Sequence, residues 1–161
     1  MSFPNKVDDT EIFDLFGPRI QFLTPLSDSD GDYCLIRGTL PAGAVVPLHS
    51  HTERETFHVL EGEIEGYLED HWTTLNVGEV FDVPGGLKHG WRNPSRASAL
   101  VLIVVPMRLG RFLREIGRPL ATVEPGPPMP GDLQRFVELA HVYGYWLGSA
   151  ADNAAAGLPS G

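Results

Sequence analysis

The chain has few of the residues on which several large classes of protein depend. Its one cysteine, Cys34, excludes a disulfide within the chain and is typical of the reducing cytosol. Its 12 lysine and arginine residues are outnumbered by 21 aspartate and glutamate residues, and the net charge of −9 argues against binding to nucleic acid or to an anionic membrane. The longest apolar run, from Ala99 to Val105, is too short to span a bilayer, and no secretory leader opens the chain. We therefore expect a cytoplasmic protein.

Turn-forming residues, by contrast, are abundant. The 18 glycines and 14 prolines separate short β-prone runs, which is typical of an all-β barrel or sandwich. A length of 161 residues suits one domain. Residues 1–18 are expected to form a short helical turn or an arm that lies on the barrel. Strands are expected near residues 19–24, 33–40, 44–49, 55–61, 63–69, 72–77, 79–83, 89–93 and 97–106.

The periodicity of the sequence becomes helical after residue 107. A first helix is predicted over 108–117, with apolar residues at helical spacing at Leu109, Phe112, Leu113 and Ile116. A second is predicted to begin with Asp132 as its N-cap and to carry an apolar stripe of Leu133, Phe136, Val137 and Ala140. The domain plan is thus a single domain over 1–161, with a barrel over about 19–106, a helical extension over about 107–148 and a flexible tail over 149–161.

Two interpretations of this extension are open. In the first, which we favour, the helices cover an open end or flank of the barrel and bury their apolar stripes against it. In the second, the basic residues on the other face of the first helix steer an anionic substrate. These basic residues are Arg108, Arg111, Arg114 and Arg118.

Three histidines and a glutamate are the residues that most clearly indicate a function. His49 and His51 are two positions apart, so they project to the same side of a strand. Glu55 opens the next apolar run, which makes it a ligand on the neighbouring strand, with Glu53 in the intervening turn. His89 follows a turn that contains proline and two glycines. Together these residues predict a mononuclear metal site.

The donor set limits the metal. Imidazole nitrogens with one carboxylate oxygen suit iron, manganese, nickel, copper, cobalt or zinc better than calcium or magnesium. We therefore expect one divalent transition metal ion per chain. Glu55 is predicted to be both a ligand and a catalytic residue, because its negative charge keeps the ion partly electron-rich. His58 is out of phase with Glu55 and His71 lies in the predicted turn 69–71, so neither is expected in the site.

The spacing around these ligands resembles the two motifs of the cupin superfamily. The first motif, Gly-x5-His-x-His-x3-Glu-x6-Gly, is formed by Gly43, His49, His51, Glu55 and Gly62. The second, Gly-x5-Pro-x-Gly-x2-His-x3-Asn, is formed by Gly78, Pro84, Gly86, His89 and Asn93. No position departs from the family pattern. Within the superfamily, the chain resembles the small single-domain quercetin-dioxygenase-like group. The resemblance implies a double-stranded β-helix, or jelly-roll, barrel that holds a metal and is often dimeric.

Two aromatic residues are candidates for substrate contacts. Trp91 shares the inward face of its strand with His89, and Phe57 shares a face with Glu55. Both are predicted to bind an organic substrate, although Trp91 could equally fill the barrel.

Several functions remain open for such a site. The first hypothesis is a metal-dependent dioxygenase acting on a small oxygenated organic molecule. A metal-dependent isomerase, epimerase or decarboxylase is a second, since a metal can act as a Lewis acid. A non-catalytic small-molecule or metal-binding protein is a third. We also expect a homodimer, with the segment near 20–23 as a strand available for pairing with a second chain.

Overall fold

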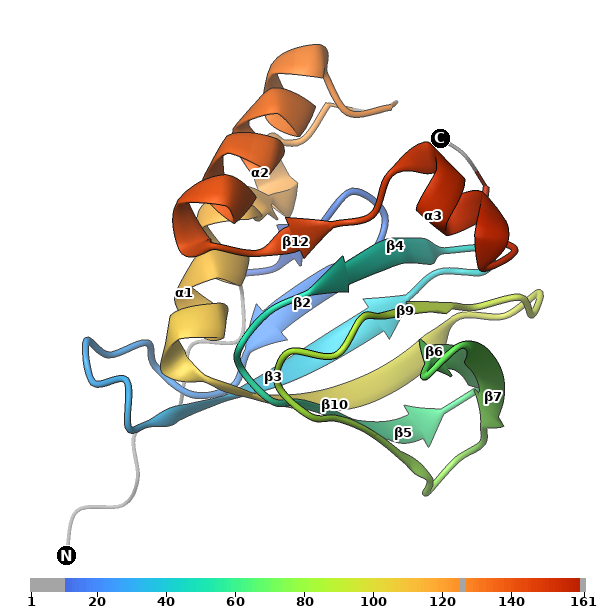
Figure 1. Cartoon of the computed structure of the whole chain (residues 1–161). Coiled ribbons are helices and arrows are strands. Elements are labelled where there is room, and N and C mark those ends of the chain that lie inside the picture. The colour runs from blue at the N-terminus through green and yellow to red at the C-terminus, as the bar shows by residue number, and fades with distance from the viewer. Residues whose placement is uncertain (1–10, 125–126, 160–161) are drawn as a thin grey trace, which may run out of the picture.

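A computed structural model of the chain describes residues 11–124 and 127–159. Over these residues the strands form two antiparallel sheets that face one another (Figure 1), so the predicted jelly-roll fold is confirmed. In spatial order, the seven-stranded sheet contains β11 (Arg118–Pro119), β1 (Phe13–Asp14), β2 (Arg19–Phe22), β3 (Tyr33–Leu40), β10 (Ala99–Pro106), β5 (Glu55–Glu61) and β8 (Val80–Val83). The five-stranded sheet contains β12 (Trp146–Leu147), β4 (Val45–Ser50), β9 (His89–Arg92), β6 (Ile64–Leu68) and β7 (His71–Leu75).

Alternation of apolar and polar residues explains the strands at the centre of the larger sheet. In β3, Ile36 is fully buried while Arg37, the next residue, is exposed. Ile103 of β10 lies opposite Ile36 on one side and Phe57 on the other. These side chains meet the apolar face of the second sheet, and their burial provides the main hydrophobic stabilisation of the domain.

The predicted strand positions agree with the structure within one or two residues at each end. The exception is His71, which the sequence predicts to lie in a turn and which instead opens β7, where it pairs with Leu68. The turn is made by Glu69 and Asp70 alone, both with positive φ (51° and 65°). Such two-residue turns match the twist of the flanking strands.

The described N-terminal residues agree with the predicted arm and not with a helical turn, and they correct the expected dimer edge. In the described residues this region contains no helical turn: Phe13 and Asp14 form β1, and the remaining predicted residues, 1–10, lie outside the described part. β1 pairs with β2, whose other side pairs with β3. The segment near 20–23 is therefore an inner strand of the sheet and not a free edge for a second chain. The homodimer stays a prediction, but the segment near 20–23 no longer provides the strand through which it would form.

The C-terminal extension begins with α1 (Met107–Ile116), which packs against α2 (Pro130–Tyr143) beyond the strand ends (Figure 1). The one-turn helix η1 (Leu120–Thr122) lies between them. α1 buries Leu109, Phe112 and Ile116, as the favoured interpretation of the extension requires. No helix in the described residues is long and apolar enough to cross a membrane.

α2 differs from its prediction at both its start and its face. Pro130 is its first residue, and Asp132 accepts a hydrogen bond from the Met129 backbone N–H (3.2 Å) from within the first turn, so Asp132 is not the N-cap. Ala140 is buried, whereas Leu133 is 47% exposed and Val137 is 54% exposed. The apolar stripe is wider than the surface of α1 that it meets.

The predicted flexible tail is wrong for residues 149–159. Ser149 and Asp152 cap α3 (Ala150–Ala155) by reciprocal hydrogen bonds. Asn153 accepts a hydrogen bond from the Leu48 backbone N–H (2.9 Å), which ties α3 to β4. Leu158 is 4% exposed. Polar anchoring thus orders a segment that has few large apolar residues.

Candidate metal centre

The two sheets jointly position the four predicted ligands. His49 lies in β4 opposite His89, the first residue of β9, in the five-stranded sheet. His51 follows directly after β4, which ends at Ser50. Glu55 is the first residue of β5 in the seven-stranded sheet. The prediction that Glu55 lies on the neighbouring strand is therefore wrong: β5 belongs to the opposite sheet, and the turn after β4 crosses between the layers.

The four side chains converge closely. One candidate ligand atom from each lies within 4.8 Å of those from the other three. Glu55 Oε2 is 3.1 Å from His51 Nε2 and 3.3 Å from His89 Nε2. The imidazole rings of His49 and His89 have centroids 4.2 Å apart. This cluster has the ligand number and the donor types of a transition-metal site.

Backbone carbonyls orient all three imidazoles in the same way. The Nδ1 atoms of His49, His51 and His89 lie 2.8–2.9 Å from the carbonyl oxygens of Pro47, Glu53 and Leu87. A carbonyl can only accept, so each Nδ1 carries a hydrogen, and Nε2 is the nitrogen that has a lone pair for a metal when the imidazole is neutral. Such contacts hold a histidine ligand in the tautomer that a metal requires.

The electrostatics of the cluster also suit a cation. Removal from water, followed by the nearby His89, lowers the pKa of His49 to about 3, so this imidazole is neutral at physiological pH. Burial alone would raise the pKa of Glu55, but hydrogen bonds with His51 and His89 outweigh it and hold that pKa well below its usual range. Burial alone would lower the pKa of His51, and its contact with Glu55 raises it instead. The cluster therefore combines a carboxylate with at least one neutral nitrogen.

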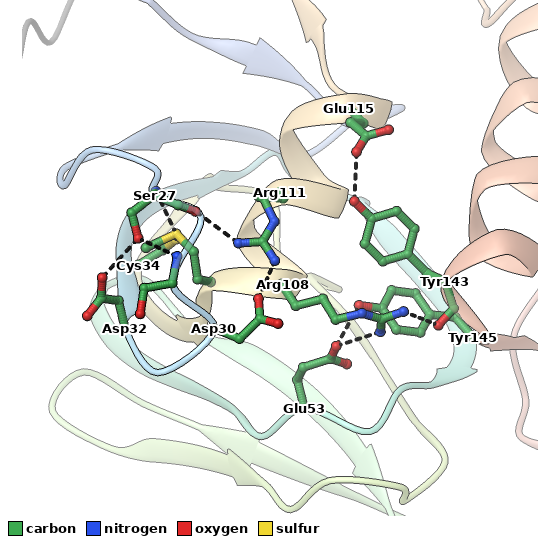
Figure 2. A network of polar contacts seen from close by, with 12 residues as sticks. Ser27, Asp30, Asp32, Cys34, Glu53, Arg108, Arg111, Glu115, Tyr143 and Tyr145 are labelled. Carbon is green, nitrogen blue, oxygen red and sulfur yellow. Dashed lines mark hydrogen bonds and ion pairs between the residues drawn. The ribbon is translucent and has the colours of Figure 1, made fainter.

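A polar network that was not predicted from the sequence holds Glu53, the residue whose backbone carbonyl orients His51. Figure 2 shows Arg108 of α1 and Tyr145 converging on Glu53. Arg108 Nη1 and the Tyr145 hydroxyl donate to Glu53 Oε1 at 2.9 and 3.0 Å. The backbone carbonyl of Glu53 is the acceptor for His51 Nδ1. The C-terminal extension thus holds the turn that orients the candidate metal ligand His51.

A cavity of about 490 Å³ opens beside the cluster. His49 and Glu55 face it, and Phe57 and Trp91 line its walls. The two aromatic rings meet edge to face, with centroids 6.3 Å apart. The inward orientation deduced for both residues agrees with the structure, and their contact with a substrate stays a prediction. The rest of the cavity is lined by further barrel residues, such as Leu40 and Ile103, and by residues of the terminal regions, among them Phe16, Phe112 and Phe136.

Other predicted features lie away from the cluster. His58 and His71 are outside it, as expected. The four arginines of the extension are each paired with an acid, which does not support substrate steering. The pairs are Arg108 with Glu53, Arg111 with Asp30, Arg114 with Glu11, and Arg118 with Asp14 and Asp132.

Fold and site together define a double-stranded β-helix protein with a cluster of three histidines and a glutamate that is compatible with a metal ion. Residues 36–106 match the family model described as the cupin domain, and this match contains both motifs. The two motifs therefore lie in a segment that matches the cupin family, and the two facing sheets have the cupin fold.

Similar proteins support the family and the fold. The chain is 29% identical over 93 residues to quercetin 2,3-dioxygenase of Bacillus subtilis, a match that covers 57% of this chain and 28% of that protein. It is 39% identical over 64 residues to an uncharacterized protein of Aquifex aeolicus, covering 39% of this chain and 53% of that one. The chain thus spans at most about half the length of these relatives. An RmlC-like cupin from Shewanella frigidimarina has a similar structure, with a TM-score of 0.54, 20% identity, and coverage of 65% of this chain and 91% of that chain.

Proposed function

We propose that this protein is a metal-dependent enzyme that acts on a small oxygenated organic molecule, and that the reaction is a dioxygenation. The observation that carries the proposal is the convergence of four candidate ligand atoms beside a cavity with apolar walls, which His49 and Glu55 line. A pocket of this volume accepts a small organic ligand, and its few polar groups fix the ligand's orientation.

The ligand residues have distinct parts in this proposal. Neutral His49 offers its Nε2 lone pair, and Glu55 supplies negative charge that stabilises a divalent cation. A bound transition metal supplies Lewis acidity and, where the ion is redox-active, a site for dioxygen. Trp91 and Phe57 exclude water and pack against the organic body of the substrate.

The choice of dioxygenation has its own support. Quercetin 2,3-dioxygenase shares 29% identity with this chain over a stretch of 93 residues. Because that stretch is 28% of the relative, the likeness supports the reaction type as a proposal and leaves the substrate open.

Elemental analysis and oxygen consumption test the proposal together. We expect about one transition-metal ion per chain in protein purified without added metal. An oxygen electrode with a panel of phenols, flavonols and diketones should then show uptake that depends on the metal. His49→Ala with His51→Ala should abolish both signals, and His58→Ala, which alters a histidine outside the cluster, should preserve both.

The other outcomes identify the alternatives. Substrate conversion without oxygen uptake would replace dioxygenation by isomerisation, epimerisation or decarboxylation. Tight ligand binding without turnover by the metal-loaded protein would make it a binding protein. Full metal occupancy in the double variant would overturn the site itself.

A further inference from the structure

We infer that the two terminal regions build a second, apolar chamber of the cavity, which binds the uncharged body of the ligand. The ligand class is then a neutral molecule with an extended apolar body and its oxygen atoms at one end. This inference deepens the proposed function, because the oxygen-bearing end is the one placed at the metal centre. The apolar chamber is defined by Leu15, Phe16, Phe112, Ile116, Leu133 and Phe136.

The lining of the cavity divides sharply by chemistry. Among the described residues that line it, the ionisable ones are His49, Glu55 and Tyr145. No lysine, arginine or aspartate is among them. The lining residues contributed by positions 15–20, α1 and α2 are all aliphatic or aromatic. A ligand body in this chamber gains free energy by leaving water, whereas a charged group there would lose its hydration without a partner.

The polar side chains of Tyr145 and Asn153, which also line the cavity, already have hydrogen-bond partners. The Tyr145 hydroxyl donates to Glu53 (3.0 Å). Asn153 Oδ1 accepts from the Leu48 backbone N–H, and its Nδ2 donates to the carbonyls of Gly148 and Ser149. A hydroxyl-rich ligand body would therefore have to break these bonds to gain hydrogen bonds of its own.

The charges around the chamber are also committed elsewhere. The Arg118 guanidinium lies 5.1 Å from the centre of the Phe16 ring and contacts Asp14 at 2.5 Å and Asp132 at 3.1 Å. Arg108 is paired with Glu53. An anionic ligand body would meet no compensating cation among the lining residues and would lie in the field of the Glu55 carboxylate.

The wall formed by Phe16 is fixed in place before any ligand binds. Phe16 has φ of 59°, a backbone conformation that non-glycine residues seldom adopt. Asp14 holds it by accepting hydrogen bonds from the backbone N–H groups of Phe16 (3.1 Å) and Gly17 (3.3 Å). The Phe16 ring then lies 5.8 Å from the Phe136 ring of α2, centroid to centroid. A preformed chamber of this kind favours shape-selective binding.

Binding of N-phenyl-1-naphthylamine, an uncharged apolar fluorophore, to metal-free protein tests the chamber directly. We expect saturable binding of about one probe per chain. 1-Octanol should displace the probe at a concentration at least roughly tenfold lower than octanoate, which has a similar chain but carries a charge. Glucose should not displace it. Absence of saturable binding, or displacement by octanoate as readily as by 1-octanol, would overturn the inference.

Two substitutions on α2 provide a matched pair. Leu133 lines the cavity and is 47% exposed, whereas Val137, one turn later, is 54% exposed and does not line it. Leu133→Lys should weaken probe binding roughly tenfold and improve displacement by octanoate. Val137→Lys should leave both unchanged. Equal effects of the two substitutions would place the probe outside the chamber and contradict the inference.

The probe lacks oxygen atoms and the protein is free of metal, so this result does not depend on the metal centre. Failure of probe binding with normal metal occupancy overturns the chamber alone. Normal probe binding with no metal occupancy overturns the proposed function and leaves the chamber standing.

Discussion

The two ends of the cavity are built in different ways. The metal end comes from four residues between positions 49 and 89, and short-range spacing brings three of them together. The apolar chamber comes from residues near positions 15–20 and 112–136, which are about a hundred residues apart in the chain. The family match covers 36–106 and therefore contains the first end and little of the second. Relatives thus bear on the chemistry of the site, while selectivity has to be read from this chain's own termini.

The largest effect is expected from removing the metal end. His49→Ala with His51→Ala deletes two of four converging donors, so metal content should fall nearly to zero. The midpoint of thermal unfolding should fall as well, since metal binding stabilises the folded state. Elemental analysis and thermal unfolding with and without chelator measure this. An equal fall of metal content and unfolding midpoint in His58→Ala would indicate a general folding defect, and the loss could then not be assigned to the metal end.

A contrast between Glu55 and Trp91 separates coordination from packing. Glu55→Gln keeps the volume and removes the charge, so metal affinity should fall first and turnover with it. Trp91→Ala should leave metal content nearly unchanged and weaken ligand binding by about 1–3 kcal/mol, because a buried aromatic contact is lost. Competition titration for metal and calorimetry for ligand give the two numbers. Loss of metal in Trp91→Ala with retention in Glu55→Gln would reverse the assignment.

Removal of one hydroxyl group should weaken the contact between the C-terminal extension and the turn that carries His51. Tyr145→Phe removes the hydroxyl that donates to Glu53 and keeps the ring that contacts His51. A hydrogen bond to a charged group contributes about 1.5–3 kcal/mol, and the part that reaches the metal should lower its affinity by a few fold. The visible spectrum of the cobalt-loaded protein should shift with it. Tyr143→Phe is the control, since its hydroxyl donates to Glu115, away from the cluster.

The last prediction concerns the acid stability of metal-free protein. The pKa of His49 is lowered to about 3 in the folded state from its ordinary 6.5, so the unfolded chain binds one more proton below pH 6.5. Stability should therefore fall as the pH drops, by up to about 1.4 kcal/mol per pH unit. Between pH 5 and 6.5 the raised pKa of His51 keeps its stabilising contribution fully present. Urea unfolding at several pH values measures this. In His49→Gln the free energy of unfolding should change less steeply with pH, and an unchanged pH dependence would show that His49 is not its cause.

The sequence predicted the parts of the molecule that depend on local repetition. Alternation of apolar and polar residues located the strands, and the two-residue spacing correctly predicted that Trp91 points inward with His89. It could not show that β5 joins the opposite sheet from β4, because sheet membership is decided by long-range pairing. For the same reason Glu53 was expected to be an ordinary turn residue, and its contacts with Arg108 and Tyr145 went unforeseen.

The termini were predicted less well because their stabilisation is not periodic. α3 depends on the cap formed by Ser149 and on one hydrogen bond from Leu48, neither of which leaves an apolar pattern in the sequence. On α2, the spacing of Leu133 and Val137 correctly indicated a helix and wrongly indicated burial. Apolar periodicity shows which side chains share a helix face, and the size of the neighbouring element decides how much of that face is covered.

Glu55 belongs to one sheet, whereas His49 and His89 belong to the other and His51 directly follows β4, and this placement has a mechanical consequence. An ion held by all four would link the two layers reversibly, joining β5 to β4 and β9, strands that share no backbone ladder with β5 in the described part of the chain. The free energy needed to open the layers would then rise with the free metal concentration, by RT ln(1 + [metal]/Kd). A protease that attacks the opened form would degrade the chain faster in metal-starved cells, so the lifetime of the protein would follow its metal supply.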